Sequence, residues 1–505
     1  MRNERYIAAI DQGTTGTRCV IFNKKGDVCG FAYKKHRQIF LDNGFIEHDP
    51  LEILKNTRIV LRQAVKNAKI EKKDVESIGI TNQRETFVIW NKYTGIPIHN
   101  AIVWQDTRTA SLIDKLQKDG FSDEIRKRTG LLLSTYFSAS KVKWLIDNSP
   151  KLKSLIKSQE ALFGNIDSWL IWNLTGGKHH YTDYTNASRT MLFNLRKMEW
   201  DNDLLHLFKI DQSILPEVLP SLNKTGFGSL IDKGFEGTII NSDLGDQQAA
   251  LFGERCFSQG ETKITYGTGS FVLQNTGKRI ILRDGLITTC AYGFGQQDCK
   301  YAIEGSVQIF GEIFDWLKNM GLLKSFNELD SILKKNLRNK VYFVPAFSGL
   351  FAPYWDNSAT GMIIGITENT KKEDIVNAAV YGLVLQINDI IKRMDKIKGY
   401  LHVDGGVSVN SEIMQLQSNI LGKKICRSNI KESSALGAAL ASGITSGFWD
   451  FDEIKNFHTE NKIFYPSSSS QINETIYYWE KAVKRAMKWK TLNRIKDRKN
   501  NEAKR

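Results

Sequence analysis

The chain has 505 residues, of which 41% are apolar and 25% charged, with 39 glycines and only 8 prolines. The length is about three times that of a typical domain, and the composition excludes a disordered or fibrous chain. The net charge of +15 does not indicate a nucleic-acid-binding protein, because residues 481–505 carry eleven Lys/Arg against two acids, a local charge of +9.

Membrane insertion and disulfide chemistry are not indicated either. No apolar run approaches the roughly 20 residues that a membrane-spanning helix needs. The six cysteines never fall into CxxC spacing and the histidines form no HExxH pair, so neither a disulfide framework nor a zinc site is expected. We expect a cytoplasmic globular protein with two large domains or a duplicated fold, no nucleic-acid partner and no membrane insertion.

The chain opens with two short β-prone runs, residues 6–10 and 18–22, joined by the Gly- and Thr-rich segment 11–17. This pattern predicts a β-hairpin. Glycine lets backbone N–H groups approach an anion and threonine adds hydroxyl donors, so the turn suits phosphate, although alone it is more typical of an ordinary hairpin. A second unit of this kind, residues 262–274, predicts a duplication with a boundary near residues 253–260.

A helix is predicted to begin after Asp49, with Asp49 as N-cap, Pro50 at N1 and Glu52 at N3. A strand is expected at residues 77–80. The polar stretch 81–85 follows this strand directly, so we expect it at a strand edge or turn, facing a cleft or solvent.

Later segments continue the alternation of strands and helices. A strand leads into the Asp-Gly-Gly sequence at 404–406, and helices are expected at residues 411–421 and 434–443. Apolar residues at 483, 487 and 489 predict a terminal helix, with the chain from Lys490 onward in solvent. The alternation predicts an α/β fold.

Several polar residues have two readings from the sequence alone. Asp246 follows Gly245 and precedes an apolar helix, so it is either a helix cap or a general base for a hydroxyl. Arg84 and Glu85 are either site residues or a surface ion pair. Trp104 and Phe271 are by default core aromatics. The P-loop and the dinucleotide-binding glycine pattern are both missing from the sequence.

Six segments then carry a resemblance that extends over nearly the whole chain: residues 11–18, 79–86, 100–105, 183–193, 245–253 and 266–269. They resemble the glycerol kinases, a group within the FGGY family of carbohydrate kinases. The resemblance implies an α/β protein with two actin-like ATPase domains, each with a ribonuclease-H-like core, that close over a central cleft. The expected domains are residues 1–253 and 254–505, with a basic tail from about residue 481.

The resemblance also implies the activity, which is ATP-dependent phosphorylation of glycerol to sn-glycerol 3-phosphate in glycerol uptake and catabolism. The expected cofactors are ATP and Mg²⁺, and the expected partners are glycerol, ATP/ADP and further copies of the chain in a homo-oligomer (dimer or tetramer). One rival is an FGGY kinase for another polyol or ketose. A second rival is an actin-like ATPase that works as a filament or chaperone module without a small acceptor.

Carried over residue by residue, the resemblance implies three groups of site residues. The glycerol group contains Arg84, Glu85, Trp104, Tyr136, Asp246, Gln247 and Phe271, with the two aromatics Trp104 and Phe271 beside the carbon chain. The nucleotide group contains Thr14, Thr15, Gly16, Arg18, Thr268, Gly311, Asp315, Gly406 and Asn410. The third group places Mg²⁺ at Asp11 and Asp246, and Asp246 is also the implied catalytic base.

Two positions depart from the family pattern. Asp315 stands where family members often carry glutamine, which makes the nucleotide contacts at this position uncertain. The loop at residues 233–239 lacks the arginine that some bacterial members use to bind an inhibitory sugar bisphosphate, so the resemblance does not extend to that regulation.

Overall fold

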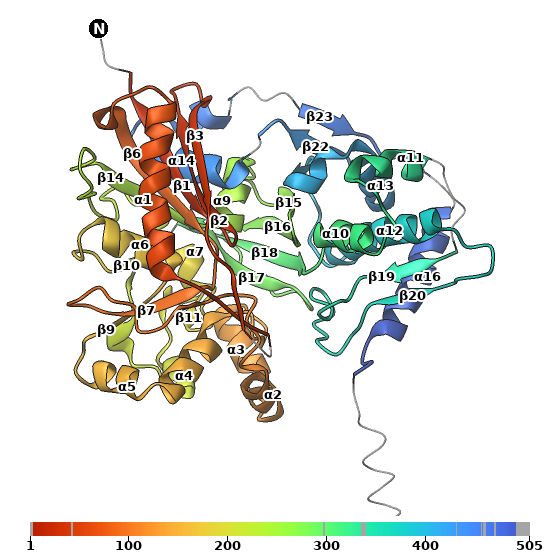
Figure 1. Cartoon of the computed structure of the whole chain (residues 1–505), viewed down its shortest axis with the longest axis horizontal. Coiled ribbons are helices and arrows are strands. Elements are labelled where there is room, and N and C mark those ends of the chain that lie inside the picture. Colours follow the sequence, from red (N-terminus) through yellow and green to blue (C-terminus); the bar gives the residue numbers. More distant parts are fainter. Residues whose placement is uncertain are drawn as a thin grey trace, which may run out of the picture.

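The computed structural model describes residues 4–41, 44–295, 298–334, 340–430, 432–455, 457, 461–468 and 471–490. The last part of the basic tail, residues 491–505, lies outside this description. The described chain is built around two large mixed sheets that lie side by side, with the N-terminal sheet on the left and the C-terminal sheet toward the centre and right of Figure 1.

The N-terminal sheet has five strands in the order β14-β6-β1-β2-β3. The C-terminal sheet has seven strands in the order β17-β18-β16-β15-β21-β22-β23. The strands of the first sheet are β1 (Tyr6–Gln12), β2 (Gly16–Phe22), β3 (Val28–Lys35), β6 (Val75–Asn82) and β14 (Ile239–Gly245). Those of the second are β15 (Thr262–Tyr266), β16 (Ser270–Gly277), β17 (Ile287–Gly293), β18 (Cys299–Val307), β21 (Leu401–Asp404), β22 (Ile425–Ser428) and β23 (Asn461–Phe464).

The two sheets repeat one pattern. In each, a hairpin is extended by a third antiparallel strand on one side and by two parallel strands on the other. β1 pairs antiparallel with β2 and parallel with β6, and β15 pairs antiparallel with β16 and parallel with β21. Both predicted hairpins are therefore confirmed, and the repeated pairing is what a duplication produces. The division of the chain at residue 253 stays a prediction.

Smaller sheets and the helices complete the fold. A second five-stranded sheet contains β4 (Ile39–Leu41), β5 (Phe45–His48), β7 (Phe87–Asn91), β8 (Ala101–Ile102) and β9 (Ala161–Asn165). Three short pairs are β10 (Tyr181–Asp183) with β13 (Glu217–Leu219), β11 (Phe193–Asn194) with β12 (Glu199–Trp200), and β19 (Tyr342–Val344) with β20 (Met362–Ile364).

The helices before β14 are α1 (Pro50–Asn67), α2 (Ala110–Lys118), α3 (Ser122–Thr129), α4 (Ser138–Asn148), α5 (Pro150–Lys157), α6 (Ile166–Leu174), α7 (Tyr184–Ala187) and α8 (Asn202–Phe208). Those after it are α9 (Asp246–Gly253), α10 (Glu312–Asn319), α11 (Leu329–Lys334), α12 (Lys372–Ile391), α13 (Ser411–Leu421), α14 (Ser433–Thr445), α15 (Phe451–Lys455) and α16 (Gln471–Ala486).

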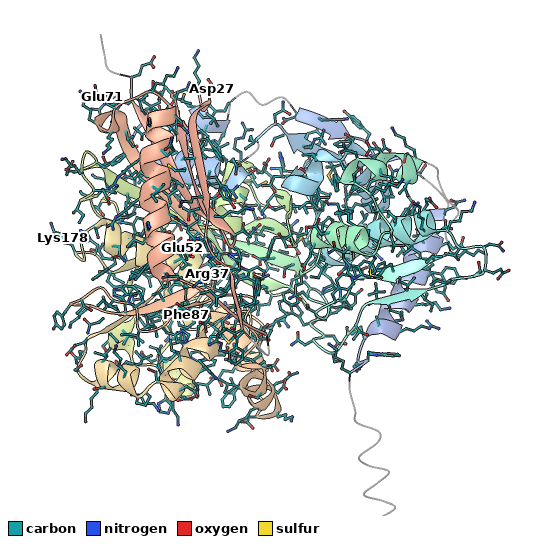
Figure 2. All side chains as sticks on the ribbon, in the orientation of Figure 1. Asp27, Arg37, Glu52, Glu71, Phe87 and Lys178 are labelled. Atoms are coloured by element: carbon teal, nitrogen blue, oxygen red, sulfur yellow. The ribbon has the colours of Figure 1, made fainter. Side chains whose placement is uncertain are left out.

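Helix α1 begins where the sequence predicts it. The carboxylate of Asp49 accepts the backbone N–H of Leu51 at 2.9 Å, and Pro50 occupies the first turn. Glu52 does not cap the helix; its carboxylate accepts the backbone N–H of Arg37 at 3.2 Å, and both residues are labelled in Figure 2. The helix is thereby fixed to the segment after β3 as well as to the sheet that it covers.

Helix α14 comes from the C-terminal half but packs on the N-terminal sheet, against α9 and β6. Close approach of the backbones requires glycine here. A Cβ on Gly437 would lie 1.8 Å from the carbonyl oxygen of Ala249, and one on Gly79 would lie 2.2 Å from that of Ala438. The Ala/Gly-rich composition from which this helix is predicted is therefore a packing requirement.

Helix α12 is long and apolar enough to cross a membrane, unlike any run that the sequence analysis identified. Polar residues such as Gln386 and Asp389 interrupt the apolar run and conceal it in the sequence. Most of the helix is buried within the C-terminal half, where Val376, Leu383 and Ile387 belong to the core. It is a core helix of this protein.

The predicted terminal helix is confirmed in part. α16 ends at Ala486, Val483 is buried in the core and Met487 packs against it. Trp489, predicted to belong to the same face, is 71% exposed because the helix has ended before it.

Candidate active site

The predicted acceptor residues meet where the two large sheets face each other. Arg84 and Glu85 follow β6, Asp246 follows β14, and Phe271 lies on β16 of the other sheet. Adjacent parallel strands bring their carboxyl ends to one edge, which is where ligands bind in such sheets. The fold thus brings together residues separated by almost 200 positions in the chain.

Arg84 is the centre of this arrangement. Its side chain is 1% exposed, and its Nε lies 3.2 Å from Oδ1 of Asp246. Nη1 donates to Glu304 at 2.6 Å and to Gln248 at 3.2 Å, while Nη2 donates to Glu304 at 3.2 Å and to the Tyr136 hydroxyl at 3.5 Å. The interpretation of Arg84 and Glu85 as a surface ion pair is wrong, because both are buried and each pairs with a different residue.

Glu85 lies in a strained turn. Its φ of 61° is in the left-handed region, which non-glycine residues rarely adopt. The hydroxyl of Ser138 donates to the Glu85 carbonyl at 2.9 Å, and Nε of Arg189 donates to the carboxylate at 2.6 Å. Burial raises the pKa of Glu85, and Arg189 and Arg84 oppose that rise. The backbone strain is thus held by the same contacts that orient the carboxylate.

Asp246 begins helix α9, and its carboxylate accepts the backbone N–H of Gln247 at 2.7 Å. The side chain remains 27% exposed. Burial raises its pKa, against the opposing charges of Arg84 and Lys263. The N-cap residue of α9 is Gly245 and no side chain caps this helix, so the capping interpretation of Asp246 is wrong. The partly exposed carboxylate lies among the acceptor residues.

Lys263 is a buried cation beside Asp246 that the sequence analysis did not identify. Its Nζ donates to Oε1 of Gln247 and, at 2.6 Å, to the hydroxyl of Thr265. Burial lowers its pKa, while Asp404 and Asp246 oppose the change. Lys263 therefore fixes the amide of Gln247 from the C-terminal sheet.

Three aromatic rings, those of Trp104, Tyr136 and Phe271, lie beside these polar groups. The Trp104 ring lies 5.4 Å from Tyr136 and 6.5 Å from Phe271, measured between centroids, with both pairs close to edge-to-face. Trp104 and Phe271 pack against buried core clusters but are themselves only partly buried, so the expectation that they are core aromatics is confirmed in part. Nε1 of Trp104 donates to the hydroxyl of Thr14 at 3.0 Å, which connects the aromatic group to the first Gly/Thr turn.

The first turn, between β1 and β2, contains the predicted residues Thr14, Thr15 and Gly16, followed by Arg18 on β2. Thr15 is exposed and Thr14 is half-buried, so their hydroxyls are accessible. Arg18 lies between two carboxylates: its Nε is 3.6 Å from Asp11, and Nη1 pairs with Glu432.

Asp11 is 5% exposed and lies near the acceptor residues. Burial raises its pKa to about 6, Arg18 opposes this rise, and the charges of Glu432 and Asp246 add to it. One buried and one partly exposed carboxylate that lie close enough for the charge of Asp246 to act on Asp11 form an oxygen-donor set that suits a hard cation such as Mg²⁺. The residues present therefore fit the predicted magnesium site.

Three predicted nucleotide residues meet around the second turn. Thr268 is exposed at its tip, and its carbonyl accepts the N–H of Phe310 at 2.8 Å. The N–H of Gly311 donates to Gly267 at 3.0 Å, and a Cβ on Gly311 would lie 2.6 Å from that same oxygen. Beside Gly406 a Cβ would meet no atom within 4 Å, so the surface there is open.

The other two predicted nucleotide residues are placed differently. The Asn410 side chain caps α13, accepting from the N–H of Ile413 at 2.9 Å, and donates to Asp330 at 2.6 Å. Asp315 points to the surface, where its side chain is 74% exposed and pairs with Lys318 at 2.9 Å. Asp315 lies one helical turn after Gly311, on α10, and its contact with the nucleotide stays a prediction.

Five further residues of this site were not identified from the sequence: Gln248, Arg189, Lys263, Glu304 and Glu432. Their partners are distant in the chain, as for Arg84 and Glu304, which are 220 positions apart. A local signal exists for two of them, because Lys263 and Glu304 are charged residues at fully buried positions of the strands β15 and β18. A charge at such a position requires a buried partner.

A second acidic group lies outside the predicted magnesium site. One carboxylate oxygen from each of Asp167, Asp183 and Asp243 lies within 4.8 Å of the others, and all three residues are buried. Asp183 is satisfied by hydroxyl and amide donors, among them Ser221 at 2.6 Å. Burial raises the pKa of Asp243, and the neighbouring Asp167 and Asp183 raise it further. Burial and the two neighbouring acids therefore favour the protonated form of Asp243.

We expect Asp243→Asn to stabilise the protein at pH 8 and to have no effect near pH 4. The folded pKa of Asp243 is raised above its unfolded value, so the wild-type stability is full at low pH and falls as pH rises through the folded pKa. The amide keeps the shape without an ionisation cost, a gain of roughly 1–3 kcal/mol. Thermal unfolding of both proteins between pH 4 and pH 8 measures this. A constant difference across that range would contradict the assignment.

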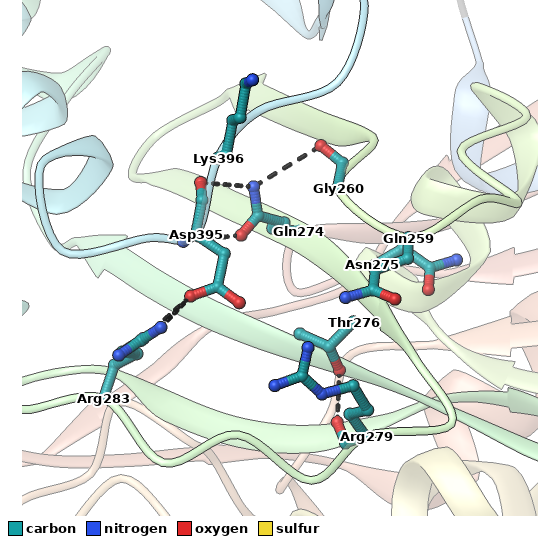
Figure 3. Close-up of a pocket in the computed structure, with 9 residues that line it drawn as sticks. All are labelled: Gln259, Gly260, Gln274, Asn275, Thr276, Arg279, Arg283, Asp395 and Lys396. Atoms are coloured by element: carbon teal, nitrogen blue, oxygen red, sulfur yellow. Dashed lines mark hydrogen bonds and ion pairs between the residues drawn. The ribbon is translucent and has the colours of Figure 1, made fainter.

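A cavity of about 450 Å³ lies elsewhere, on the C-terminal half. Figure 3 shows its lining residues, none of which is a predicted site residue. The polar groups there already pair with the protein: Gln274 donates to the carbonyl of Asp395 at 3.1 Å, Arg283 pairs with the Asp395 carboxylate, and Thr276 donates to the carbonyl of Arg279 at 2.7 Å. Several of the polar groups that line the cavity are therefore engaged within the protein.

Comparison with known proteins decides the family. The model of the FGGY family of carbohydrate kinases, N-terminal domain, matches residues 6–253, and the model of its C-terminal domain matches residues 262–446. The chain belongs to the FGGY family of carbohydrate kinases. The predicted α/β class with two actin-like, ribonuclease-H-like domains is thereby confirmed, and this FGGY kinase is an enzyme of phosphoryl transfer.

Three relatives similar to this chain within the FGGY family are glycerol kinases. A glycerol kinase of Clostridium botulinum is 46% identical over 496 residues, which is 96% of this chain and 99% of that protein. A glycerol kinase of Treponema denticola is also 46% identical over 496 residues, covering 96% of this chain and 100% of the relative. The crystal structure of Plasmodium falciparum glycerol kinase with ADP is 37% identical, has a TM-score of 0.88, and covers 96% of this chain and 98% of that chain.

Proposed function

We propose that this FGGY kinase transfers the γ-phosphoryl group of ATP to a terminal hydroxyl of glycerol, giving sn-glycerol 3-phosphate and ADP. One observation carries the proposal: buried polar side chains and partly exposed aromatic rings face each other beside a carboxylate. A small triol has hydroxyls that need donors and acceptors, and C–H groups that tolerate aromatic faces. The glycerol kinases similar to this chain over nearly its full length support the same acceptor.

The acceptor contacts follow from the placement of the side chains. Arg84 and Tyr136 present donors, and Glu85 and Gln247 present oxygens, to the glycerol hydroxyls. Because Asp246 is the partly exposed carboxylate among them, it accepts the proton of the attacking hydroxyl. The glycerol oxygen then forms the new bond to the γ-phosphorus as the bond from that phosphorus to the ADP oxygen breaks.

The rings of Trp104 and Phe271 lie beside the carbon chain of glycerol and exclude water from the reacting hydroxyl. Exclusion matters because water, at about 55 M, competes with glycerol as acceptor. The Trp104 indole N–H is already occupied by Thr14, so the ring contributes its apolar surface rather than a donor.

The phosphates of ATP bind between the two Gly/Thr turns. Thr14, Thr15, Gly16 and Arg18 contact them from the first turn and Thr268 from the second, while Gly311, Gly406 and Asn410 lie toward the nucleoside. Asp315, with an exposed side chain on α10, is also assigned to the nucleotide.

Asp11 and Asp246 hold Mg²⁺, directly or through its water molecules. When bound, the ion offsets the negative charge of the phosphates. We also propose that the enzyme is located in the cytoplasm and forms a homo-oligomer.

We expect Asp11→Asn to raise the Mg²⁺ concentration needed for half-maximal activity about tenfold or more, because the amide removes the charge that attracts the cation. A Mg²⁺ titration at saturating glycerol and ATP measures this, and Asp232→Asn, at an ion pair with Arg62 away from the turns, serves as the matched control. An unchanged titration would show that Asp11 does not hold the ion.

The proposal is tested against both rival functions with one acceptor panel. ADP release is measured with ATP and, separately, glycerol, other polyols, ketoses or no acceptor. We expect glycerol to give the highest kcat/KM and acceptor-free release to be at least 100-fold slower. A higher kcat/KM for another polyol or ketose would favour the first rival, and ADP release independent of acceptor would favour the ATPase module.

A further inference from the structure

Glu304 belongs to a group of four buried charged residues with Arg84, Arg189 and Glu85. Its carboxylate, 0% exposed on β18, accepts from Arg84 at 2.6 and 3.2 Å and from Arg189 at 3.1 and 3.4 Å. Arg189 in turn holds Glu85. Within these four residues two positive and two negative charges cancel, which avoids the cost of an unpaired charge in the interior, and Asp246 adds a partly exposed negative charge beside Nε of Arg84.

The Arg84 guanidinium has five N–H donors in a rigid plane. Glu304 binds both terminal nitrogens, so it fixes the orientation of that plane. As a result Nε faces Asp246 at 3.2 Å, and Nη2 also reaches the Tyr136 hydroxyl, at the longer distance of 3.5 Å. The long bond is the one that a substrate hydroxyl most easily replaces.

Glu304 also connects the two halves of the enzyme. It lies on β18, which pairs with β16, the strand that carries Phe271. Arg84 and Arg189 come from the N-terminal half. The β16–β18 pair therefore supplies both Phe271, an aromatic residue of the acceptor site, and Glu304. The carboxylate of Glu304 orients the two arginines from the N-terminal half.

We propose that Glu304 is a positioning residue of the acceptor site: it sets the direction in which Arg84 presents its N–H groups to glycerol and, through Arg189, holds the carboxylate of Glu85 in place. This inference rests on the proposed function. Glu304 itself touches no substrate, so its effect passes through the two arginines.

The charge of Glu304 is constant under assay conditions. Burial alone would raise its pKa, but the guanidinium groups of Arg189 and Arg84 outweigh burial and lower the pKa to about 2. Replacing the carboxylate by an amide therefore changes the charge of this group at every assay pH.

Glu304→Gln is the direct test. We expect the KM for glycerol to rise at least tenfold while the KM for ATP changes less than twofold, because only the acceptor residues lose their fixed orientation. Asp201→Asn is the matched control: it also removes the charge from a buried acid, one that pairs with Arg128 at 3.0 Å away from the site. The control should lose thermal stability and keep both KM values.

Glu304→Asp covers the case in which the amide variant does not fold. Aspartate keeps the charge but is shorter by one methylene, so we expect a folded protein with a raised KM for glycerol. An unchanged KM for glycerol in either folded variant, or equal rises in both KM values, would overturn the inference. The wild type is assayed first: if it does not phosphorylate glycerol, the proposed function fails instead, and the comparison is repeated with the acceptor that it does use.

Discussion

Replacing Asp246 by Asn should lower kcat by about 10² to 10⁴, the range for loss of a general base. The amide keeps the size and, through its oxygen, the hydrogen bond from the backbone N–H of Gln247, but it cannot accept the proton of the attacking hydroxyl. The KM for glycerol should change by only a few-fold, because Arg84 and Glu85 remain. Steady-state kinetics of the purified variant measure both values.

Asp201→Asn is again the control, since Asp201 also begins a helix and accepts backbone N–H groups there, at α8. A kcat near the wild-type value in Asp246→Asn would refute the role of Asp246 as base. A similar loss in the control would show that removing a carboxylate at the start of a helix, rather than removing a base, lowers kcat.

Arg84→Ala should raise the KM for glycerol by roughly 10- to 100-fold, the equivalent of one charge-assisted hydrogen bond of about 1.5–3 kcal/mol. The KM for ATP should stay within a few-fold, since the described contacts of Arg84 are with acceptor-side residues and Glu304. The variant also leaves Glu304 with Arg189 as its only guanidinium partner, so it should unfold at a lower temperature. Equal increases in both KM values would instead place Arg84 with the phosphates.

Local features of the fold were predictable because their causes are local. The start of α1 follows from Asp49 and Pro50, and each hairpin follows from two β-prone runs around a Gly/Thr turn. The duplication was visible for the same reason, since the two hairpins have the same pattern. These features depend on residues that are close together in the chain.

Features that depend on distant contacts were not predictable from local patterns. The packing of α14 on the other half depends on Gly437 fitting against Ala249, and neither residue indicates its partner. The predicted acceptor residues came from the resemblance, whereas Glu304 and Arg189 became recognisable only once the fold placed them beside Arg84 and Glu85. The surface position of Asp315 likewise depends on how α10 lies on the second sheet.

The most direct test of phosphoryl transfer to glycerol is the identity of the product. The wild-type enzyme is incubated with ATP, Mg²⁺ and glycerol, and the product is examined by phosphorus NMR and by oxidation with a dehydrogenase specific for sn-glycerol 3-phosphate. We predict one phosphomonoester, formed in equal amount to ADP and oxidised completely. Inorganic phosphate as the main product, or a phosphomonoester that the dehydrogenase leaves unoxidised, would contradict the placement of glycerol against Arg84, Glu85 and Asp246.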